Sequence, residues 1–463
     1  MIKKGLGKKM DFTNKKVLII GSGISGVGAA ELLCKMGAKV FLFDGGEKAT
    51  VEGIQEKLPQ GCTPEIIVGT LSDTVKAEIE LVVPSPGVPT DTPFMMEFKN
   101  KGIPVWGELE LGYLCGKGKV IAITGTNGKT TTTSLVGDIM RDYYRSVFVV
   151  GNIGRAYTLE ALNMGEDTMT VAEVSSFQLE TVEHFHPVVS AILNVTPDHL
   201  NRHHTMENYA VTKENVARNQ TKNDTCVLNY DNEYTKAFGE NCPARVVYFS
   251  SSQVLQDGLY LKGDEIMLAQ GGKSKALLNV KTDMNLVGLC NYENVCAAIG
   301  IAMSAGVPMD SILRTIKNFH AVEHRIEYVA TKKGVMYYND SKATNTDAAI
   351  QGIRAMDRPT VLIGGGYDKG SEYDDWIENF NGKVKRLVLI GATRDKIAEC
   401  ARRHGFEAII LADTFEEAME ICVKEAEPGD AVLLSPACAS WGMFPNYEVR
   451  GQLFKEIVKG LED

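Results

Sequence analysis

Ile121-Ala-Ile-Thr-Gly125-Thr-Asn-Gly128-Lys129-Thr130-Thr-Thr-Thr is the stretch around which this chain can be interpreted. The apolar run 120–123 predicts a buried parallel strand, and the apolar spacing after Thr130 predicts a helix. Glycines between the two let backbone N–H groups approach phosphates, and the helix N-terminus adds partial positive charge. We therefore expect a phosphate-binding loop here.

The side chains of this loop fit a nucleotide. Lys129 would reach the β- and γ-phosphates, and the Thr130 hydroxyl would hold Mg2+. The usual pattern has a glycine five positions before Gly128, where this chain has Ile123, so the loop is a shortened form, Gly-x-x-Gly-Lys-Thr. A threonine-rich turn without a ligand is the alternative, and the flanking strand and helix disfavour it.

Length and composition exclude several classes of protein. A chain of 463 residues predicts about two to four domains. The net charge of −10 offers no basic field for nucleic acid. The ten cysteines form no C-x-x-C pair, as in a cytosolic protein with reduced thiols and no metal cluster. The lysine-rich residues 1–10 lack the apolar core of a signal peptide, and no stretch is long enough to span a membrane. We predict a cytoplasmic protein without membrane insertion.

Residues 1–107 resemble a nucleotide-binding unit. Gly21-Ser-Gly23-Ile-Ser-Gly26 follows an apolar strand, and Asp44 ends the next one. This is the Rossmann fingerprint, which taken alone indicates a dinucleotide. Its physical content is a helix N-terminus ready for a pyrophosphate, so any nucleotide diphosphate would suit it.

In residues 108–321, further strands bring polar residues to the edge of the phosphate loop. Glu173 ends one predicted strand, and Asp198-His199 follow another. A carboxylate beside a phosphate loop is a usual Mg2+ ligand. A lone histidine is normally a surface residue, but the convergence of three strand ends favours a function for His199. Residues 224–287 look rich in short strands.

Two other features of this segment stay open from the residues alone. Lys213 lies on a predicted helix, where the local pattern predicts a solvated surface charge. Asn291 and Asn294 fall in the first turns of a strongly apolar helix. They could cap it, or their amides could contact a purine edge.

Residues 322–463 predict a third α/β sheet with polar loops at its strand ends. Asp340-Ser-Lys342-Ala-Thr344-Asn345 opens a helix directly after a strand, and Lys369 follows Gly364-Gly-Gly. Such runs bind ligands more often than they merely connect elements. A surface lysine on a glycine-rich turn is the alternative for Lys369.

These three parts together suit a ligase. The phosphate loop implies ATP, the pyrophosphate fingerprint a nucleotide-bearing substrate, and the third sheet an anionic co-substrate. ATP would convert a carboxylate to an acyl phosphate, which an amine would then attack. Catalysis would rest on positioning and charge neutralisation.

Several motifs follow one another along the chain. The motifs are Gly125-Thr-Asn-Gly-Lys-Thr130, Gly151-Asn-Ile-Gly154, Glu173-Val-Ser-Ser-Phe-Gln-Leu-Glu180, Asn194-Val-Thr-Pro-Asp-His199, Asn291-Tyr-Glu-Asn294, His324-Arg325, Asp340-Ser-Lys-Ala-Thr-Asn345 and Ser435-Pro-Ala-Cys-Ala-Ser440. In this order they resemble the motifs of the Mur ligases of peptidoglycan synthesis. The resemblance runs from Lys16 to the C-terminal helix, and the last two motifs are similar to those of the D-glutamate-adding members.

The resemblance implies an α/β fold with three domains. Residues 1–107 would form a Rossmann-like domain for the UDP substrate. Residues 108–321 would form a P-loop ATPase-like domain with a parallel sheet and a small β-region, and residues 322–463 a Rossmann-like domain for the incoming amino acid. The implied reaction adds D-glutamate to UDP-N-acetylmuramoyl-L-alanine through an acyl phosphate, with ATP and Mg2+. It belongs to cytoplasmic cell-wall synthesis, and we expect a monomer.

The resemblance also implies roles for individual residues. Those of catalysis are Lys129, Glu173, His199, Lys213 and Arg325. Those holding metal are Thr130, Glu173, His199 and, if carbamylated, Lys213. Those binding ATP are Gly125, Thr126, Asn127, Gly128, Lys129, Thr130, Thr131, Asn291, Asn294, His324, Arg325, Asp340 and Lys342. Those binding the UDP substrate are Ile24, Ser25, Asp44, Ser85, Asn152 and His199. Those binding D-glutamate are Thr344, Lys369, Ser440 and Tyr447.

Three residues depart from the family pattern, at two places in the chain. Gly45 and Gly46 replace a Thr-Arg pair found in some relatives, which affects the expected uracil contacts. Tyr447 stands where a phenylalanine can occur, so its hydroxyl could add a polar contact.

Other functions predict different behaviour. Another Mur ligase or a folylpolyglutamate synthase would use a different amino acid or acceptor. An NAD-dependent dehydrogenase or dinucleotide sensor would bind NAD at the N-terminal fingerprint. A nucleotide-gated interaction protein would bind nucleotide without turnover.

Overall fold

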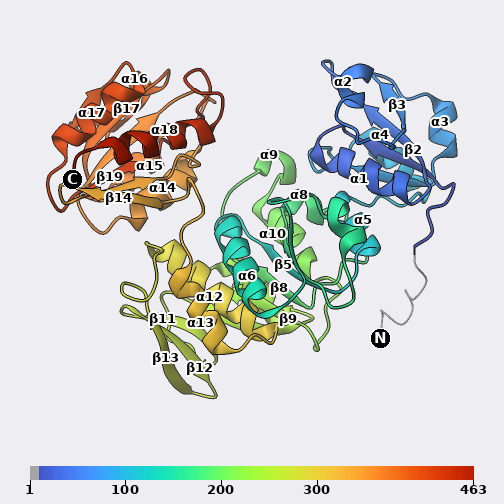
Figure 1. Ribbon diagram of the computed structural model, residues 1–463, viewed down its shortest axis with the longest axis horizontal. Helices are drawn as coiled ribbons and strands as arrows, with labels where there is room; N and C mark the ends of the chain where they lie inside the picture. Colours follow the sequence, from blue (N-terminus) through green and yellow to red (C-terminus); the bar gives the residue numbers. More distant parts are fainter. Residues whose placement is uncertain (1–9) are drawn as a thin grey trace. The chain divides into compact units, whose positions relative to one another are not determined.

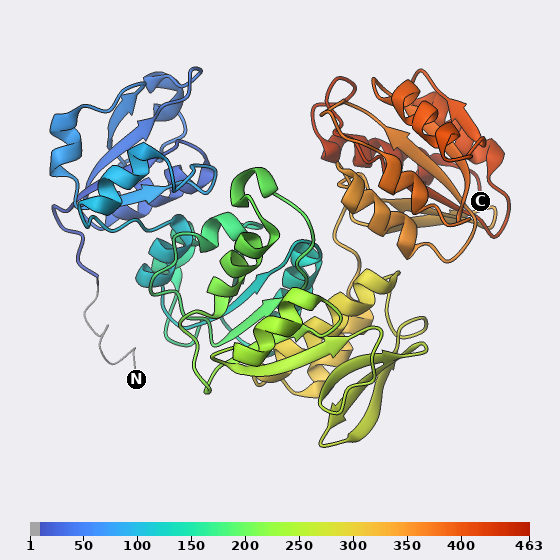
Figure 2. The same ribbon diagram turned by 180° about the vertical axis from the view of Figure 1, so that it is seen from behind.

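The computed structural model describes residues 10–463, so the lysine-rich start of the chain lies, apart from Met10, outside the described residues. This part divides into two compact units (Figures 1 and 2). The first runs to Lys262 and adds Met267–Leu277 and Asn294–Thr315; the second consists of Gly263–Ile266, Leu278–Glu293 and Ile316–Asp463.

The first sheet of the chain is parallel, in the order β3-β2-β1-β4. Its strands are β1 (Lys16–Ile20), β2 (Lys39–Asp44), β3 (Glu65–Val68) and β4 (Leu81–Pro84). The helices around it are α1 (Ile24–Lys35), α2 (Val51–Gln55), α3 (Asp73–Glu78) and α4 (Pro93–Asn100).

Alternate residues of β1 point to opposite faces of this sheet and are buried on both. Val17 and Ile19 pack with apolar residues of α1, whereas Leu18 and Ile20 pack with Met95 and Phe98 of α4. Because helices cover both faces, the strand reads as one apolar run.

The apolar residues of 103–106 predict a further strand, and this prediction is wrong. Val105 forms only an isolated bridge with Val82 of β4. The preceding residue, Pro104, accepts a hydrogen bond from the Val82 N–H, but it has no N–H with which to extend a ladder.

The second sheet has nine strands in the order β13-β12-β11-β10-β9-β8-β5-β7-β6. In this spatial order, all neighbouring strands from β11 through β5 to β6 pair in parallel. The strands are β5 (Lys119–Thr124), β6 (Val147–Gly151), β7 (Met169–Glu173), β8 (Val189–Ile192), β9 (Thr225–Asn229), β10 (Arg245–Ser250), β11 (Gly258–Lys262), β12 (Glu265–Gln270) and β13 (Lys273–Asn279). The helices of this region are α5 (Glu108–Cys115), α6 (Lys129–Tyr143), α7 (Tyr157–Glu160), α8 (Ser176–Leu179), α9 (Leu200–His203), α10 (Met206–Glu214), α11 (Glu233–Asn241), α12 (Leu289–Ser304) and α13 (Met309–Asn318).

The strand before the phosphate loop lies inside this sheet, because β5 pairs with β7 on one side and β8 on the other. Helix α6 packs across β5, β6 and β7. The buried side chains of its apolar stripe include Leu135, Val136, Ile139 and Met140. The predicted strand, glycine turn and helix are therefore confirmed, with the loop at the carboxyl edge of the sheet.

The third sheet has six strands in the order β14-β15-β19-β16-β17-β18, antiparallel only between β14 and β15. The strands are β14 (Glu327–Lys332), β15 (Val335–Asn339), β16 (Thr360–Gly365), β17 (Val384–Ile390), β18 (Ile409–Leu411) and β19 (Ala431–Leu434). The helices are α14 (Thr346–Ala355), α15 (Asp374–Glu378), α16 (Arg394–Arg403), α17 (Phe415–Glu425) and α18 (Tyr447–Gly460). Helices α14, α15 and α16 share one apolar core with the sheet, and α17 and α18 share the other.

Three α/β sheets confirm the predicted fold class. Within residues 10–463, no helix combines the length and apolarity that crossing a bilayer requires. All ten cysteines are free, and seven of them are buried.

Candidate functional site

The backbone conformation at the end of the phosphate loop requires a glycine. Gly128 is the N-cap of α6 and has φ +83°. A Cβ atom at this position would lie 2.2 Å from Asn294 Oδ1. The left-handed backbone and the close amide together leave room only for a hydrogen atom.

A neighbouring strand end holds the loop in place. The Asn194 side chain, which follows β8, accepts a hydrogen bond from the Asn127 N–H at 2.8 Å and donates to the Asn127 carbonyl at 3.2 Å. Thr126 Oγ1 donates to the Thr196 carbonyl and accepts from the Thr196 N–H. The motif that contains Asn194 does not by itself predict this role, which depends on the pairing of β5 with β8.

Lys129 is folded back onto its own loop. Its Nζ donates to the carbonyls of Gly125, at 2.9 Å, and Thr126, at 2.8 Å. The ammonium thus lies at the loop, where a phosphate group would attract it.

Glu173 ends β7 beside the loop, and its side chain fits a cation ligand. The residue is 1% exposed. Its Oε1 accepts a hydrogen bond from Asn152 Nδ2 at 2.7 Å, while Oε2 has no hydrogen-bond partner within the described residues. A buried carboxylate oxygen without a donor is costly unless something else compensates it. Magnesium prefers such oxygen ligands, and one or two carboxylates usually bind it.

The expectation that Lys213 is a solvated surface residue is wrong. The side chain is 1% exposed, because α10 packs its face carrying Tyr209 and Ala210 into the core below the loop. Its Nζ donates to the Gly125 carbonyl at 2.9 Å and lies 4.5 Å from the centre of the Tyr209 ring. Burial, reinforced by the charge of Lys129, lowers the pKa of Lys213 well below its usual range. A neutral amine of this kind can act as a nucleophile, which the ammonium form cannot.

His199 lies in the loop after β8 and is half-exposed. It is the N-cap of α9 with φ +52°, its N–H donates to Asp198 Oδ1, and its ring lies 4.9 Å from that of Phe177. No hydrogen bond joins His199 to Glu173 within residues 10–463. The structure therefore places His199 on the predicted sheet edge, in the loop after β8.

The N-terminal fingerprint forms a helix N-terminus open to solvent. Gly23 caps α1, and Ile24, the first residue of the helix, is 81% exposed. Asp44 Oδ2 accepts from the Ser22 N–H and hydroxyl, and Oδ1 accepts from the Gly46 N–H. Burial opposes the charge on Asp44, but these hydrogen bonds prevail and lower its pKa. Gly46, which departs from the family pattern, thus supports the carboxylate through its backbone.

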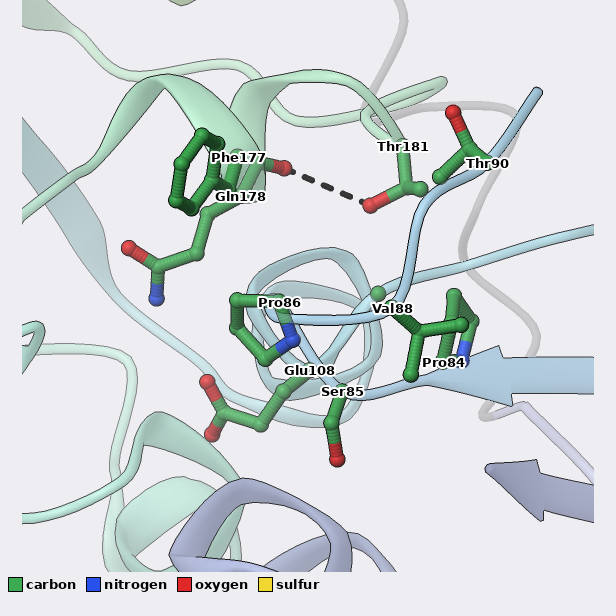
Figure 3. A pocket seen from close by; sticks show the side chains of 10 residues that line it. Pro84, Ser85, Pro86, Val88, Thr90, Glu108, Phe177, Gln178 and Thr181 are labelled. Atoms are coloured by element: carbon green, nitrogen blue, oxygen red, sulfur yellow. Dashed lines mark hydrogen bonds between the residues drawn. The ribbon is translucent and has the colours of Figure 1, made fainter. Parts of the chain in front are cut away.

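A small hollow, partly open to solvent, adjoins this region within the first unit. Figure 3 shows Ser85 and Pro86, after β4, across the hollow from Phe177 and Gln178 of α8. The remaining lining residues are Pro84, Val88, Thr90, Gly107, Glu108 and Thr181. Of the residues predicted to bind the UDP substrate, Ser85 lies here.

The second unit brings His324, Asp340 and Lys342 together near α18. His324 is buried, and its Nδ1 accepts from Asn339 Nδ2 at 2.9 Å. Asp340 Oδ2 accepts from Ser435 Oγ at 2.7 Å, and burial raises the pKa of Asp340 to about 7. Lys342 Nζ lies 5.5 Å from the centre of the Tyr447 ring, and burial raises the pKa of Tyr447 to about 12.

The loops carrying Lys369 and Ser440 are also joined in this unit. The Tyr367 N–H donates to the Ala439 carbonyl at 2.8 Å. Lys369 Nζ lies 4.8 Å from the centre of the Trp441 ring. The predicted amino-acid loops are therefore adjacent, whereas the predicted ATP-binding residues are divided between the two units, and their roles stay a prediction.

Comparison with known proteins identifies the family. A UDP-N-acetylmuramoylalanine–D-glutamate ligase from Lachnospira eligens is 58% identical over 452 residues, which cover 98% of this chain and 100% of the relative. The chain belongs to the Mur ligase family. Its parts match the Mur ligase MurD-like N-terminal domain at residues 15–107, the Mur ligase middle domain at 123–302 and the Mur ligase glutamate ligase domain at 324–438.

Further Mur ligases support this conclusion. The ligase of the same name from Clostridioides difficile is 44% identical over 98% of this chain and 100% of its own length. A MurC structure from Thermotoga maritima matches with a TM-score of 0.58 at 18% identity, covering 96% of this chain and 99% of that one. A MurF ligase from Thermotoga maritima in complex with ADP matches with a TM-score of 0.59 at 17% identity, covering 91% and 95%. The two structures share the fold, and family membership argues against the dehydrogenase alternative.

Proposed function

We propose that this Mur ligase joins D-glutamate to UDP-N-acetylmuramoyl-L-alanine at the expense of ATP, in the cytoplasmic synthesis of peptidoglycan precursors. The observation that carries the proposal is the identity of 58% and 54%, over 98% of the chain, to two ligases named for this reaction. The loops Asp340–Asn345 and Ser435–Ser440 support the D-glutamate specificity by their resemblance to D-glutamate-adding members.

The reaction consists of two displacements. The terminal carboxylate of the UDP-linked substrate takes the γ-phosphoryl group of ATP, which gives an acyl phosphate and ADP. The neutral amine of D-glutamate then attacks the acyl carbon, so that the amide C–N bond forms, the C–O bond to phosphate breaks and the nitrogen loses one proton. Positioning and charge neutralisation dominate such transfers.

The central residues supply the charges for the first displacement. Lys129 and the N-terminus of α6 stabilise the phosphates, and Arg325 neutralises charge on the γ-phosphoryl group. Thr130, Glu173 and His199, with Lys213 as a carbamate, are the residues that would hold Mg2+. Bound there, Mg2+ would offset the negative charge that develops on the phosphate oxygens.

The pKa of Lys213 supports its carbamylation. A buried amine with a depressed pKa carries a lone pair that can attack CO2, with loss of one proton. The product is an anion that a metal stabilises. It places a negative, carboxylate-like group beside the positive charge of Lys129, which attracts it.

The domain assignment completes the proposal. Residues 1–107 bind the UDP moiety, residues 108–321 bind ATP, and residues 322–463 bind D-glutamate, on a monomeric enzyme. Within the last domain, Thr344, Lys369, Ser440 and Tyr447 contact the amino acid.

An amino-acid panel tests the proposed function. ATP-dependent phosphate release is measured with UDP-N-acetylmuramoyl-L-alanine and, separately, D-glutamate, L-glutamate, D-aspartate, L-alanine and L-lysine. We expect release with D-glutamate, and none when the UDP substrate is omitted. Release with another amino acid but not with D-glutamate would overturn the assignment.

A further inference from the structure

Trp441 and Lys369 form a cation–aromatic pair in the second unit. Lys369 Nζ lies 4.8 Å from the centre of the indole ring, within the range in which a ring face attracts an ammonium. The Tyr367 ring contacts the same indole edge-on, with the ring centres 5.6 Å apart. Trp441 directly follows Ser440, so the pair borders the loop that the proposed function assigns to D-glutamate.

The backbone brings these side chains together. The Tyr367 N–H donates to the Ala439 carbonyl, and the two residues form an antiparallel bridge. A Cβ atom at Gly366, where φ is +154°, would lie 2.3 Å from the same carbonyl. The loop after β16 and the loop after β19 are thus held in close backbone contact at Tyr367, and Lys369 and Trp441 follow shortly after this contact in their respective loops.

The charge of Lys369 remains available to a ligand. Within residues 10–463, Lys369 has no carboxylate within ion-pair distance, and its recorded partner is the indole ring. The adjacent carboxylate of Asp368 instead accepts a hydrogen bond from the Gly370 N–H at 2.7 Å. An aromatic partner restrains a lysine without neutralising it, whereas an aspartate would compete with an incoming anion.

Trp441 is 53% exposed, so its indole contributes little to the core. A free lysine side chain loses much rotamer freedom when it is fixed on a ligand. A ring that already restrains the ammonium reduces this loss at the moment of binding.

We propose that Trp441 is a positioning residue that holds the Lys369 ammonium for a carboxylate of the incoming amino acid. The proposal rests on the proposed function, in which Lys369 belongs to the amino-acid pocket. It adds a specificity-supporting contact from a residue outside the motifs that resemble other Mur ligases.

Steady-state phosphate release with Trp441→Leu and Trp441→Phe tests the proposal. Leucine keeps an apolar side chain but has no ring face, and phenylalanine keeps a weaker one. We expect Trp441→Leu to raise KM for D-glutamate about three- to tenfold and to leave KM for ATP and for the UDP substrate unchanged. Trp441→Phe should lie between Trp441→Leu and the wild type.

Tyr328→Leu is the matched control, because Tyr328 is a similarly exposed aromatic residue on β14 of the same unit, with 49% exposure. It should not change any KM. Thermal unfolding of all variants shows whether they are folded, and equal melting temperatures exclude a general loss of structure.

A double-mutant cycle with Lys369→Ala shows whether Trp441 acts through this lysine. We expect Lys369→Ala to raise KM for D-glutamate strongly and the addition of Trp441→Leu to raise it little further. Additive effects, an unchanged KM in Trp441→Leu, or equal increases in KM for D-glutamate and ATP would overturn the positioning role. Failure of the wild type to use D-glutamate at all would instead overturn the proposed function.

Discussion

Lys129 and Lys213 donate hydrogen bonds to the same acceptor, the carbonyl oxygen of Gly125, at 2.9 Å each. Lys129 comes from the start of α6 and Lys213 from α10, so two basic side chains far apart in the sequence converge on one backbone atom. Two full positive charges at this spacing repel each other. Lys213 is buried, so desolvation, together with the charge of Lys129, lowers its pKa well below its usual range.

This convergence predicts a specific defect in Lys213→Ala. If Lys213 acts as a carbamate, its loss removes a negative group from the metal site, and most ligase activity should disappear. A short carboxylate such as acetate or formate should partly restore it by occupying the vacated space. Phosphate release is measured with and without the carboxylate.

Lys236→Ala is the control, since Lys236 is an exposed lysine over the Tyr230 ring in the same unit. It should keep wild-type activity and show no response to added carboxylate. Full activity of Lys213→Ala without rescue would contradict a carbamate at this position.

The buried, uncompensated Oε2 of Glu173 predicts altered metal use in Glu173→Gln. Glutamine keeps the size of the side chain and can still interact with Asn152, but it lacks the charge that favours a divalent cation. We expect activity at fixed Mg2+ to fall at least about tenfold and the Mg2+ concentration for half-maximal activity to rise. A Mg2+ titration of phosphate release measures both quantities.

Glu166→Gln removes an exposed carboxylate from the same unit, where the Glu166 side chain is 82% exposed. Its Mg2+ titration should coincide with that of the wild type. A Glu173→Gln titration that also coincided with the wild type would exclude Glu173 as a metal ligand.

Local sequence was sufficient where a feature is built from neighbouring residues. The strand, glycine turn and helix around Gly128 and the helix N-terminus after Gly23 both follow from apolar spacing and glycine placement. Pairing between distant segments was not accessible in this way. The burial of Lys213 depends on how α10 packs below Gly125, and the stacking of Lys342 on Tyr447 joins residues about a hundred positions apart. The prediction of a strand around Val105 failed for the same reason. How far the pairing extends there depends on the partner strand β4, which is distant in sequence.

The geometry at Gly128 predicts that Gly128→Ala loses nucleotide use for a steric reason. Alanine would have to adopt the left-handed backbone conformation of Gly128. Its methyl group would also lie 2.2 Å from Asn294 Oδ1. Adopting φ near +83° costs a residue with a Cβ about 1–2 kcal/mol, and the clash must displace Asn294 or distort the loop. We expect a large increase in KM for ATP, measured by phosphate release at saturating D-glutamate and UDP substrate.

Gly102→Ala separates the two costs. Gly102 has φ +71°, but a Cβ atom there meets nothing within 4 Å. This variant should lose a comparable amount of stability from backbone strain and keep its KM for ATP. Equal KM values for ATP in the two variants would show that the close approach of Asn294 does not constrain the loop.

The buried carboxyl of Asp340 predicts a pH-dependent stability that Asp340→Asn removes. Burial raises the pKa of Asp340 in the folded protein from 3.8 to about 7, so between these values the folded state binds a proton that the unfolded state has released. The stability contributed by this group is therefore complete below pH 3.8 and declines as pH rises towards 7, by at most about 4 kcal/mol.

Asparagine does not titrate, so the melting temperature of Asp340→Asn relative to wild type should rise from pH 5 to pH 8, in the absence of nucleotide. Asp395→Asn, at an exposed position on α16, is the control for replacing an aspartate by asparagine elsewhere in the same unit. A constant difference between Asp340→Asn and wild type across this range would mean that Asp340 is ionised throughout, held by the charges of Arg325 and Arg450, which oppose the effect of burial.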